Sequence, residues 1–488
     1  MTNRLRRGFL LATIVLSCVF SAHAQAPAER EAVHLTPAAA VDMAIRNNLH
    51  LEMARINLDI SRRRSNLVWN QFLPTVGVTG TLSRSNWATS AGGIVPIPGT
   101  GTPITVDGIS GRFGPDIFAA DPMTLPRWNV IGALNAELIF SFALIEGIQA
   151  IRNEYAAGLI TLERAKLQME QGIRKMYNGI LLLKANVDLL KESYRNTQRQ
   201  AEMAEASFRA GLAPRLAWLQ AQVAVENMRP AVRDLENTLE SLKGNFALLL
   251  GLPHGTPFVL QPISFWGSVI PWDLAEMLSR AASGKPDIQE LQANIITLQS
   301  QRQALRLQNH TPFIMFGWTL STMFDPTLSP FRESWFTRDN WTSQGQAGGA
   351  FSVTVGMNFN SLFSHTREGQ QLRDMDAALQ MQNIMLAQTI RETELEVFSH
   401  INSLERIRTN VEVQQATVYL AEESFRLTEE AFRAGLQDFQ SVQNAALALD
   451  QARLRVLTEQ FNYLNYLIDL EYSLGIPFGT LSGNGSVE

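Results

Sequence analysis

Hydrophobic and polar residues alternate with a period of two in four short segments of the chain, at about 72–85, 127–140, 312–325 and 347–360. In the last of these, Phe351, Val353 and Val355 alternate with polar residues. A period of two places alternate side chains on opposite faces of a strand. The four segments are therefore predicted to be β-strands with one apolar and one polar face.

Two proline-free segments, at about 144–208 and 367–432, are predicted to be very long helices. At 1.5 Å per residue each would extend about 100 Å, several times the usual length of a globular helix. A return helix is predicted after each one, at 213–250 and 437–474. Glycines that favour a bend or break in the first long helix are Gly147, Gly158, Gly172 and Gly179.

The two halves of the chain repeat one unit. The turn Phe208-Arg209-Ala210-Gly211-Leu212 recurs as Phe432-Arg433-Ala434-Gly435-Leu436, and Gly251-Leu252-Pro253 recurs at the same offset as Gly475-Ile476-Pro477. Each copy has a helical approach segment, two strands, a long helix and a return helix, so a duplication is predicted. The predicted boundaries are a first repeat at 25–253, a linker or equatorial segment at 254–271, a second repeat at 272–477 and a C-terminal tail at 478–488.

The N-terminus has the features of an export signal. Arg4, Arg6 and Arg7 precede an apolar run, and Ala22-His23-Ala24 supplies small residues where a signal peptidase cleaves. Residues 1–24 are therefore predicted to be a cleaved signal peptide. The alternative is a lipoprotein acylated on Cys18. Both interpretations predict an exported protein.

Composition excludes several classes of function. The chain has 488 residues, 45% of them hydrophobic, and a formal net charge of −5. A chain of this composition can bury a core, and its slightly acidic balance gives no electrostatic reason to bind nucleic acid. The single cysteine excludes a disulfide framework and a cysteine-based zinc site.

No catalytic, cofactor or metal constellation is recognisable, so we expect no enzyme activity and no cofactor. The chain has no phosphate-binding loop of the Gly-x-x-x-x-Gly-Lys-Ser/Thr type, and its histidines are scattered without metal-ligand spacing. His400, on a predicted helix, is expected to be packed or solvated. Met375, Met381 and Met385 are expected to fill gaps in a core. The alternative is a methionine ladder for metal export.

The strands offer a way across a membrane. No segment beyond the signal has about 18 consecutive apolar residues, whereas each predicted strand has about the 9–11 residues that a tilted transmembrane strand needs. A barrel of about eight strands is only just filled by side chains. A conducting lumen therefore needs strands from several chains, and three chains fit best. The connections at 85–126 and 325–345 are then expected to be extracellular loops. The alternative is a soluble sandwich with one wet face.

The order of these elements resembles the TolC family of outer membrane efflux proteins over essentially the whole mature sequence. The resemblance implies a mostly α fold with a transmembrane β-barrel: two long antiparallel helical hairpins plus four strands per chain, in a trimer that forms a 12-stranded barrel and an α-helical periplasmic tunnel. It also implies location in the cell outer membrane, a periplasmic adaptor (a membrane fusion protein) and an inner-membrane pump as partners.

The function implied is a passive exit duct of a tripartite efflux or secretion system. Two alternatives are a soluble periplasmic coiled-coil scaffold without a pore and an exported enzyme. By resemblance, the periplasmic tips that dock an adaptor are Arg209, Gly211, Leu212, Arg433, Gly435 and Leu436. Family members often carry acidic residues at the tunnel mouth, where this chain has Ser441 and Asn444. The candidates for a constriction here are Asp438, Ser441, Asn444 and Gln220.

Overall fold

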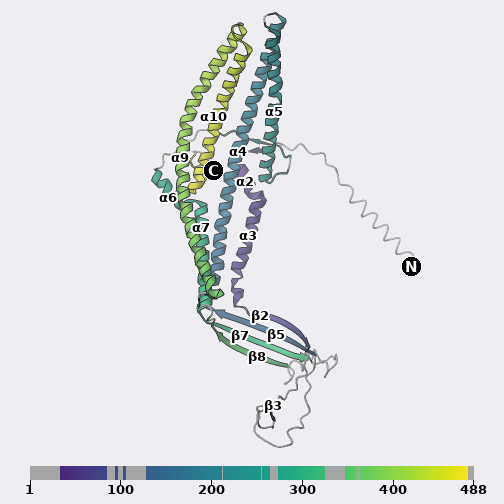
Figure 1. Cartoon of the computed structure of the whole chain (residues 1–488), viewed down its shortest axis with the longest axis vertical. Helices are drawn as coiled ribbons and strands as arrows, with labels where there is room; N and C mark the ends of the chain where they lie inside the picture. The colour runs from purple at the N-terminus through teal and green to yellow at the C-terminus, as the bar shows by residue number, and fades with distance from the viewer. Residues whose placement is uncertain are drawn as a thin grey trace, which may run out of the picture. The chain divides into compact units, whose positions relative to one another are not determined.

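A computed structural model gives the structure of the chain (Figure 1). It describes residues 33–84, 94–96, 103–105, 128–211, 213–253, 255–263, 273–324, 347–357, 359, 363 and 365–481. The predicted signal peptide, most of the two predicted extracellular loops, and residues 482–488 of the tail lie outside these residues. The chain divides into two compact units. The helical unit is drawn from Met1–Asn57, Leu159–Glu290 and Leu386–Glu488, and the sheet unit is formed by Leu58–Gly158 and Leu291–Met385.

Two long hairpins make up most of the helical unit. Helix α4 (Phe142–Arg209) enters this unit and turns into α5 (Arg215–Leu249), while α9 (Arg367–Arg433) turns into α10 (Phe439–Leu474). Figure 1 shows the two helices of each hairpin running side by side. Helix α4 is continuous through its four glycines. The break considered from the sequence is therefore absent, because a glycine in a helix interior lowers stability without removing a hydrogen bond.

Each hairpin has an apolar interior. In the first hairpin, Ile173, Tyr177 and Ile180 of α4 pack with Leu239 and Phe246 of α5 in one buried cluster. In the second, Val397, Leu404, Ile407 and Val411 of α9 share a buried cluster with residues of α10. The partners on α10 are Tyr463, Leu467, Leu470 and Leu474. Burial of these side chains supplies most of the stability of the hairpins, because helices in proteins are stabilised mainly by packing of an apolar face.

Short elements pack on the hairpins. Strand β1 (Val33–Leu35) pairs in parallel with β6 (Phe258–Leu260), and the buried Tyr177 hydroxyl donates to the carbonyl oxygens of Leu35 and Gln261, at 2.8 Å each. Burial raises the pKa of Tyr177 to about 12, so this hydroxyl stays protonated and can donate both bonds alternately.

Each approach segment is a pair of helices rather than one helix. In the first repeat α2 (Pro37–Asn47) is followed by α3 (Leu49–Asn66), and in the second α6 (Leu274–Gly284) is followed by α7 (Pro286–His310). Asn48 separates the first pair, since its side-chain oxygen accepts from the backbone N–H of His50 at 2.8 Å. An asparagine that caps a new helix in this way ends the preceding one.

The sheet unit contains a four-stranded antiparallel sheet in the order β2 (Thr75–Arg84), β5 (Trp128–Ser141), β7 (Phe313–Phe324) and β8 (Ala347–Gly356). The central strands β5 and β7 belong to different repeats and pair with each other. Figure 1 shows the four strands in this order. Among the described residues, β2 and β8 each pair on one side only. As far as the structure describes the chain, the sheet therefore has two free edges.

The register gathers most of the large apolar residues of the four strands on one face. One row across the sheet joins Val76, Ala136, Trp318 and Phe351, and the neighbouring row joins Thr75, Glu137, Gly317 and Ser352. The apolar face is open: Val76 and Phe351 are 67% and 68% exposed. No helix within the described residues has the length and apolar character needed to cross a membrane. A smaller sheet pairs β3 (Ile94–Pro96) with β4 (Pro103–Thr105).

Candidate functional site: the two hairpin turns

Both turns reverse the chain at a glycine in the left-handed conformation. Gly211 has φ 74° and Gly435 has φ 72°. An added Cβ would meet nothing within 4 Å at either position, so the glycine is required by backbone conformation and not by lack of space. The backbone N–H of Gly435 donates to Phe432 O at 3.0 Å, and that of Leu436 to Ala431 O at 2.9 Å. This pair of bonds satisfies the last carbonyl groups of α9, as in a Schellman motif.

The arginine of each turn is exposed and is paired along its own helix. Arg209 contacts Glu205 at 2.5 Å, and Arg433 contacts Glu429 at 2.9 Å. Their side chains are 76% and 60% exposed. Pairs of this kind on a helix surface contribute little to stability, and at this exposure both guanidinium groups are accessible. Leu436 is 79% exposed. Leu212 lies outside the described residues.

Three of the four residues predicted to narrow the tunnel mouth have local roles around the second turn, and the fourth follows the first turn. Asp438 is the N-cap of α10: it accepts from the backbone N–H of Ser441 at 2.9 Å and from its hydroxyl at 2.5 Å. These bonds hold the pKa of Asp438 below its ordinary value. Asn444 accepts from Gln440 at 3.3 Å. Gln220 is exposed on α5.

Aromatic side chains brace both turns, a feature that the sequence reasoning did not identify. Phe208 stacks on Trp218 across the first turn, with ring centroids 5.6 Å apart. Phe439, the residue after the Asp438 cap, is 2% exposed and packs with alanines of the first hairpin. These alanines are Ala204, Ala221 and Ala224. The sequence did contain a feature from which these contacts could have been predicted: an aromatic residue lies within a few positions of each glycine turn.

A groove of about 530 Å³ lies between α4 and α9 beside the second turn. Its charged lining residues are Arg199, Glu202, Glu429 and Arg433, and Phe425 adds an apolar surface. The groove therefore joins one of the predicted docking arginines to a mixed charged and apolar surface that a helical partner could fill.

Within the described residues, no cluster of three or more histidine, cysteine, aspartate or glutamate side chains could hold a metal ion. Met381 and Met385 are 65% and 53% exposed. The expectation that they fill a core is therefore wrong within a single chain, because the face of α9 that carries them is uncovered. A helical period alone does not tell which face a neighbour covers.

Comparison with known proteins shows that the chain shares its fold with solved outer membrane channels. Residues 40–251 match the family described as outer membrane efflux protein. Among solved structures, the chain is similar to CusC at 18% identity with a TM-score of 0.69, over 94% of this chain and 96% of CusC.

Two further channels have the same fold. VceC from Vibrio cholerae shares 16% identity with a TM-score of 0.67, over 91% of this chain and 96% of VceC. The open state of MtrE from Neisseria gonorrhoeae shares 15% identity with a TM-score of 0.65, over 95% of both chains. No protein of curated function matches the sequence. The mostly helical fold predicted from the sequence, with two long hairpins and a sheet of four strands per chain, is confirmed, as is the resemblance to outer membrane efflux proteins.

Proposed function

We propose that the protein is the outer-membrane exit duct of a tripartite efflux or secretion system. It conducts substrates passively from a pump and adaptor complex across the periplasm and the outer membrane, and it is not an enzyme. The observation that carries this function is the sheet with one apolar face, one polar face and two free edges. Such a sheet buries its apolar face only in lipid or against a partner.

The proposed assembly is a homotrimer. Free strand edges favour pairing with another chain, and three sheets of four strands give the twelve strands of a barrel wide enough for a polar lumen. The polar row with Thr75, Glu137 and Ser352 would line this lumen. The soluble coiled-coil scaffold without a pore is not supported by the comparisons, since the matched structures are outer membrane channels.

We assign adaptor docking to the two hairpin turns. The support is the exposure of Arg209, Arg433 and Leu436 and the groove that begins at Arg433. Asp438, Ser441, Asn444 and Gln220 remain the proposed constriction, with hydrogen bonds in place of the acidic ring common in the family. The bond from Ser441 to Asp438 is charge-assisted and holds this part of the mouth.

Membrane insertion and conductance test the duct. The purified protein should require detergent, give three copies per particle by native mass spectrometry, and conduct ions in a planar bilayer. Asp438→Ala should raise the conductance, because it removes the hydrogen bonds that hold the proposed constriction, and an unchanged conductance would remove Asp438 from it. Extraction into buffer without detergent, as a monomer without channel activity, would contradict the proposal.

Export measured in cells tests the docking turns. Arg433→Glu should reduce export and co-purification of the adaptor while the trimer remains intact. Arg229→Glu is a matched control, because Arg229 is an exposed arginine, 63% accessible, and lies 14 residues beyond the start of α5. Equal export by both variants would show that Arg433 does not contribute to docking of the adaptor.

A further inference from the structure

The two hairpins meet at an interface between α4 and α10, which we call the seam. The seam is polar, whereas the interior of each hairpin is apolar. Gln171 of α4 donates to Asp469 of α10 at 2.8 Å, Lys175 forms an ion pair with the same carboxylate, and Asn178 donates to Asn465 at 2.9 Å. Directional polar contacts of this kind can exchange partners at lower cost than interlocked apolar side chains. Asp469 is therefore the centre of an interface that can rearrange.

His400 of α9 lies beside Tyr466 of α10, and Tyr466 and Asp469, three residues apart, share one face of that helix. The ring of His400 lies 5.7 Å from that of Tyr466. Its Nδ1 is buried and has no hydrogen-bond partner among the described residues. A buried ring nitrogen without a hydrogen-bond partner is rare, because it lowers the stability of the fold. If Nδ1 carried a proton, it would need a hydrogen-bond acceptor.

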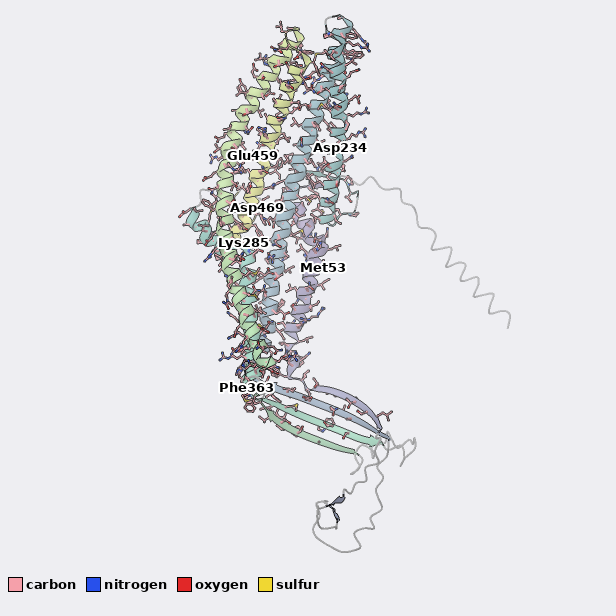
Figure 2. All side chains as sticks on the ribbon, in the orientation of Figure 1. Met53, Asp234, Lys285, Phe363, Glu459 and Asp469 are labelled. Carbon is pink, nitrogen blue, oxygen red and sulfur yellow. The ribbon has the colours of Figure 1, made fainter. Side chains whose placement is uncertain are left out.

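Four charged groups act on His400. The carboxylates of Asp469 and Glu396 favour its protonated form, whereas the ammonium groups of Lys175 and Lys285 oppose it. Glu396 is already held by Lys285, at 2.6 Å, and Lys285 also donates to Thr393. Lys285 and Asp469 are labelled in Figure 2. Asp469 is thus the carboxylate on the neighbouring helix to which a protonated His400 can turn.

We propose that His400 is a proton-responsive switch that redirects Asp469 between the two hairpins. With neutral His400, Asp469 binds Lys175 and Gln171 of α4 and joins the hairpins. When His400 takes a proton from solvent, Asp469 turns to the new Nδ1–H of α9, and the seam with α4 loses its central contact. The inference rests on the helical unit alone and does not depend on the export function.

The direction of the pH response follows from the burial of His400. Burial holds the pKa of His400 below its ordinary value of 6.5, mainly because the charged ring is poorly solvated. A histidine with a lowered pKa in the folded protein favours the folded arrangement when neutral, and this contribution is lost as the pH falls through that pKa. The contact between the hairpins should therefore hold at pH 7.5 and loosen as the pH falls below the ordinary pKa of histidine.

Spin-label distances between α4 and α10 test the switch in the intact assembly. Lys184 and Gln451 are exposed on the two helices, and Cys18, the one native cysteine, lies in the predicted signal peptide. A Lys184→Cys and Gln451→Cys protein should show a reversible change in its distance distribution between pH 7.5 and pH 5.5. His400→Gln should lose this change, and Asp469→Asn should give the acidic distribution at both pH values.

His50→Gln is the matched control, because His50 is exposed on α3, and it should keep the full change. If His400→Gln does not assemble, His400→Asn takes its place as the neutral variant. An unchanged distribution in the parent protein, or a full pH response without His400, would overturn the proposal. Because the readout is a distance, its failure is distinguishable from a failure of export.

Discussion

The two hairpin turns have the same five-residue sequence motif and the same left-handed glycine, yet their surroundings differ. At the first turn α5 begins after Pro214, with no side-chain cap, and Phe208 stacks on Trp218 of the same hairpin. At the second turn Asp438 caps α10, and Phe439 is buried against the other hairpin. The shared motif thus produces the same backbone conformation in both turns. The residues that follow it decide whether a turn packs only within its own hairpin or is anchored to the other hairpin.

Among substitutions that distinguish the two turns, Phe439→Ala should lower the stability of the protein most. Removal of a fully buried phenylalanine costs about 3–5 kcal/mol, because it loses apolar burial and leaves a cavity among the alanines. We expect rapid proteolysis at the second turn and a lower thermal midpoint. Phe208→Ala should cost much less, because Phe208 is only partly buried. Equal effects of the two substitutions would contradict the difference between an anchored second turn and an independent first turn.

Valine in place of glycine should affect the two turns alike. Gly211→Val and Gly435→Val each place a β-branched residue at a positive φ, at a cost of about 1–2 kcal/mol, although neither site is crowded. Asparagine tolerates this conformation, so Gly435→Asn is the control. The measurement is hydrogen exchange at the ends of α4 and α9. A change confined to one turn would contradict the common backbone geometry.

The Asp438 cap should make the second turn, and not the first, sensitive to acid. The pKa of Asp438 is lowered by its bonds from Ser441, so its contribution is present above the ordinary value of 3.8 and is lost as the pH falls through the lowered pKa. Hydrogen exchange at the start of α10 should therefore increase in acid, and Asp438→Asn should remove most of that dependence. An identical increase at the start of α5 would point to a general loss of structure.

The smallest effect on stability is expected from the turn arginines. Arg209→Ala and Arg433→Ala each remove an exposed pair along one helix, worth about 0.3–0.5 kcal/mol. Thermal midpoints should barely change, so any loss of adaptor binding is attributable to the lost guanidinium. A marked drop in stability would instead assign a structural role to these residues.

Local sequence patterns determined the elements of this protein. The alternation at Phe351, Val353 and Val355 specifies a two-faced strand, and the glycine turns at Gly211 and Gly435 end their helices through backbone conformation alone. Periodicity and a left-handed turn are properties of neighbouring residues, so they can be recognised without knowing what packs nearby.

Only the tertiary structure decided which polar and aromatic residues meet. Asp469, Gln171 and Asn178 occur at helical spacings that also suit an exposed face, and Phe439 could have served as an ordinary residue of the first turn of α10. Their partners lie up to 298 residues away in the chain. Since the period of a helix is the same whether a polar face meets water or another helix, the packing of the two hairpins is what turns these side chains into a seam and an anchor.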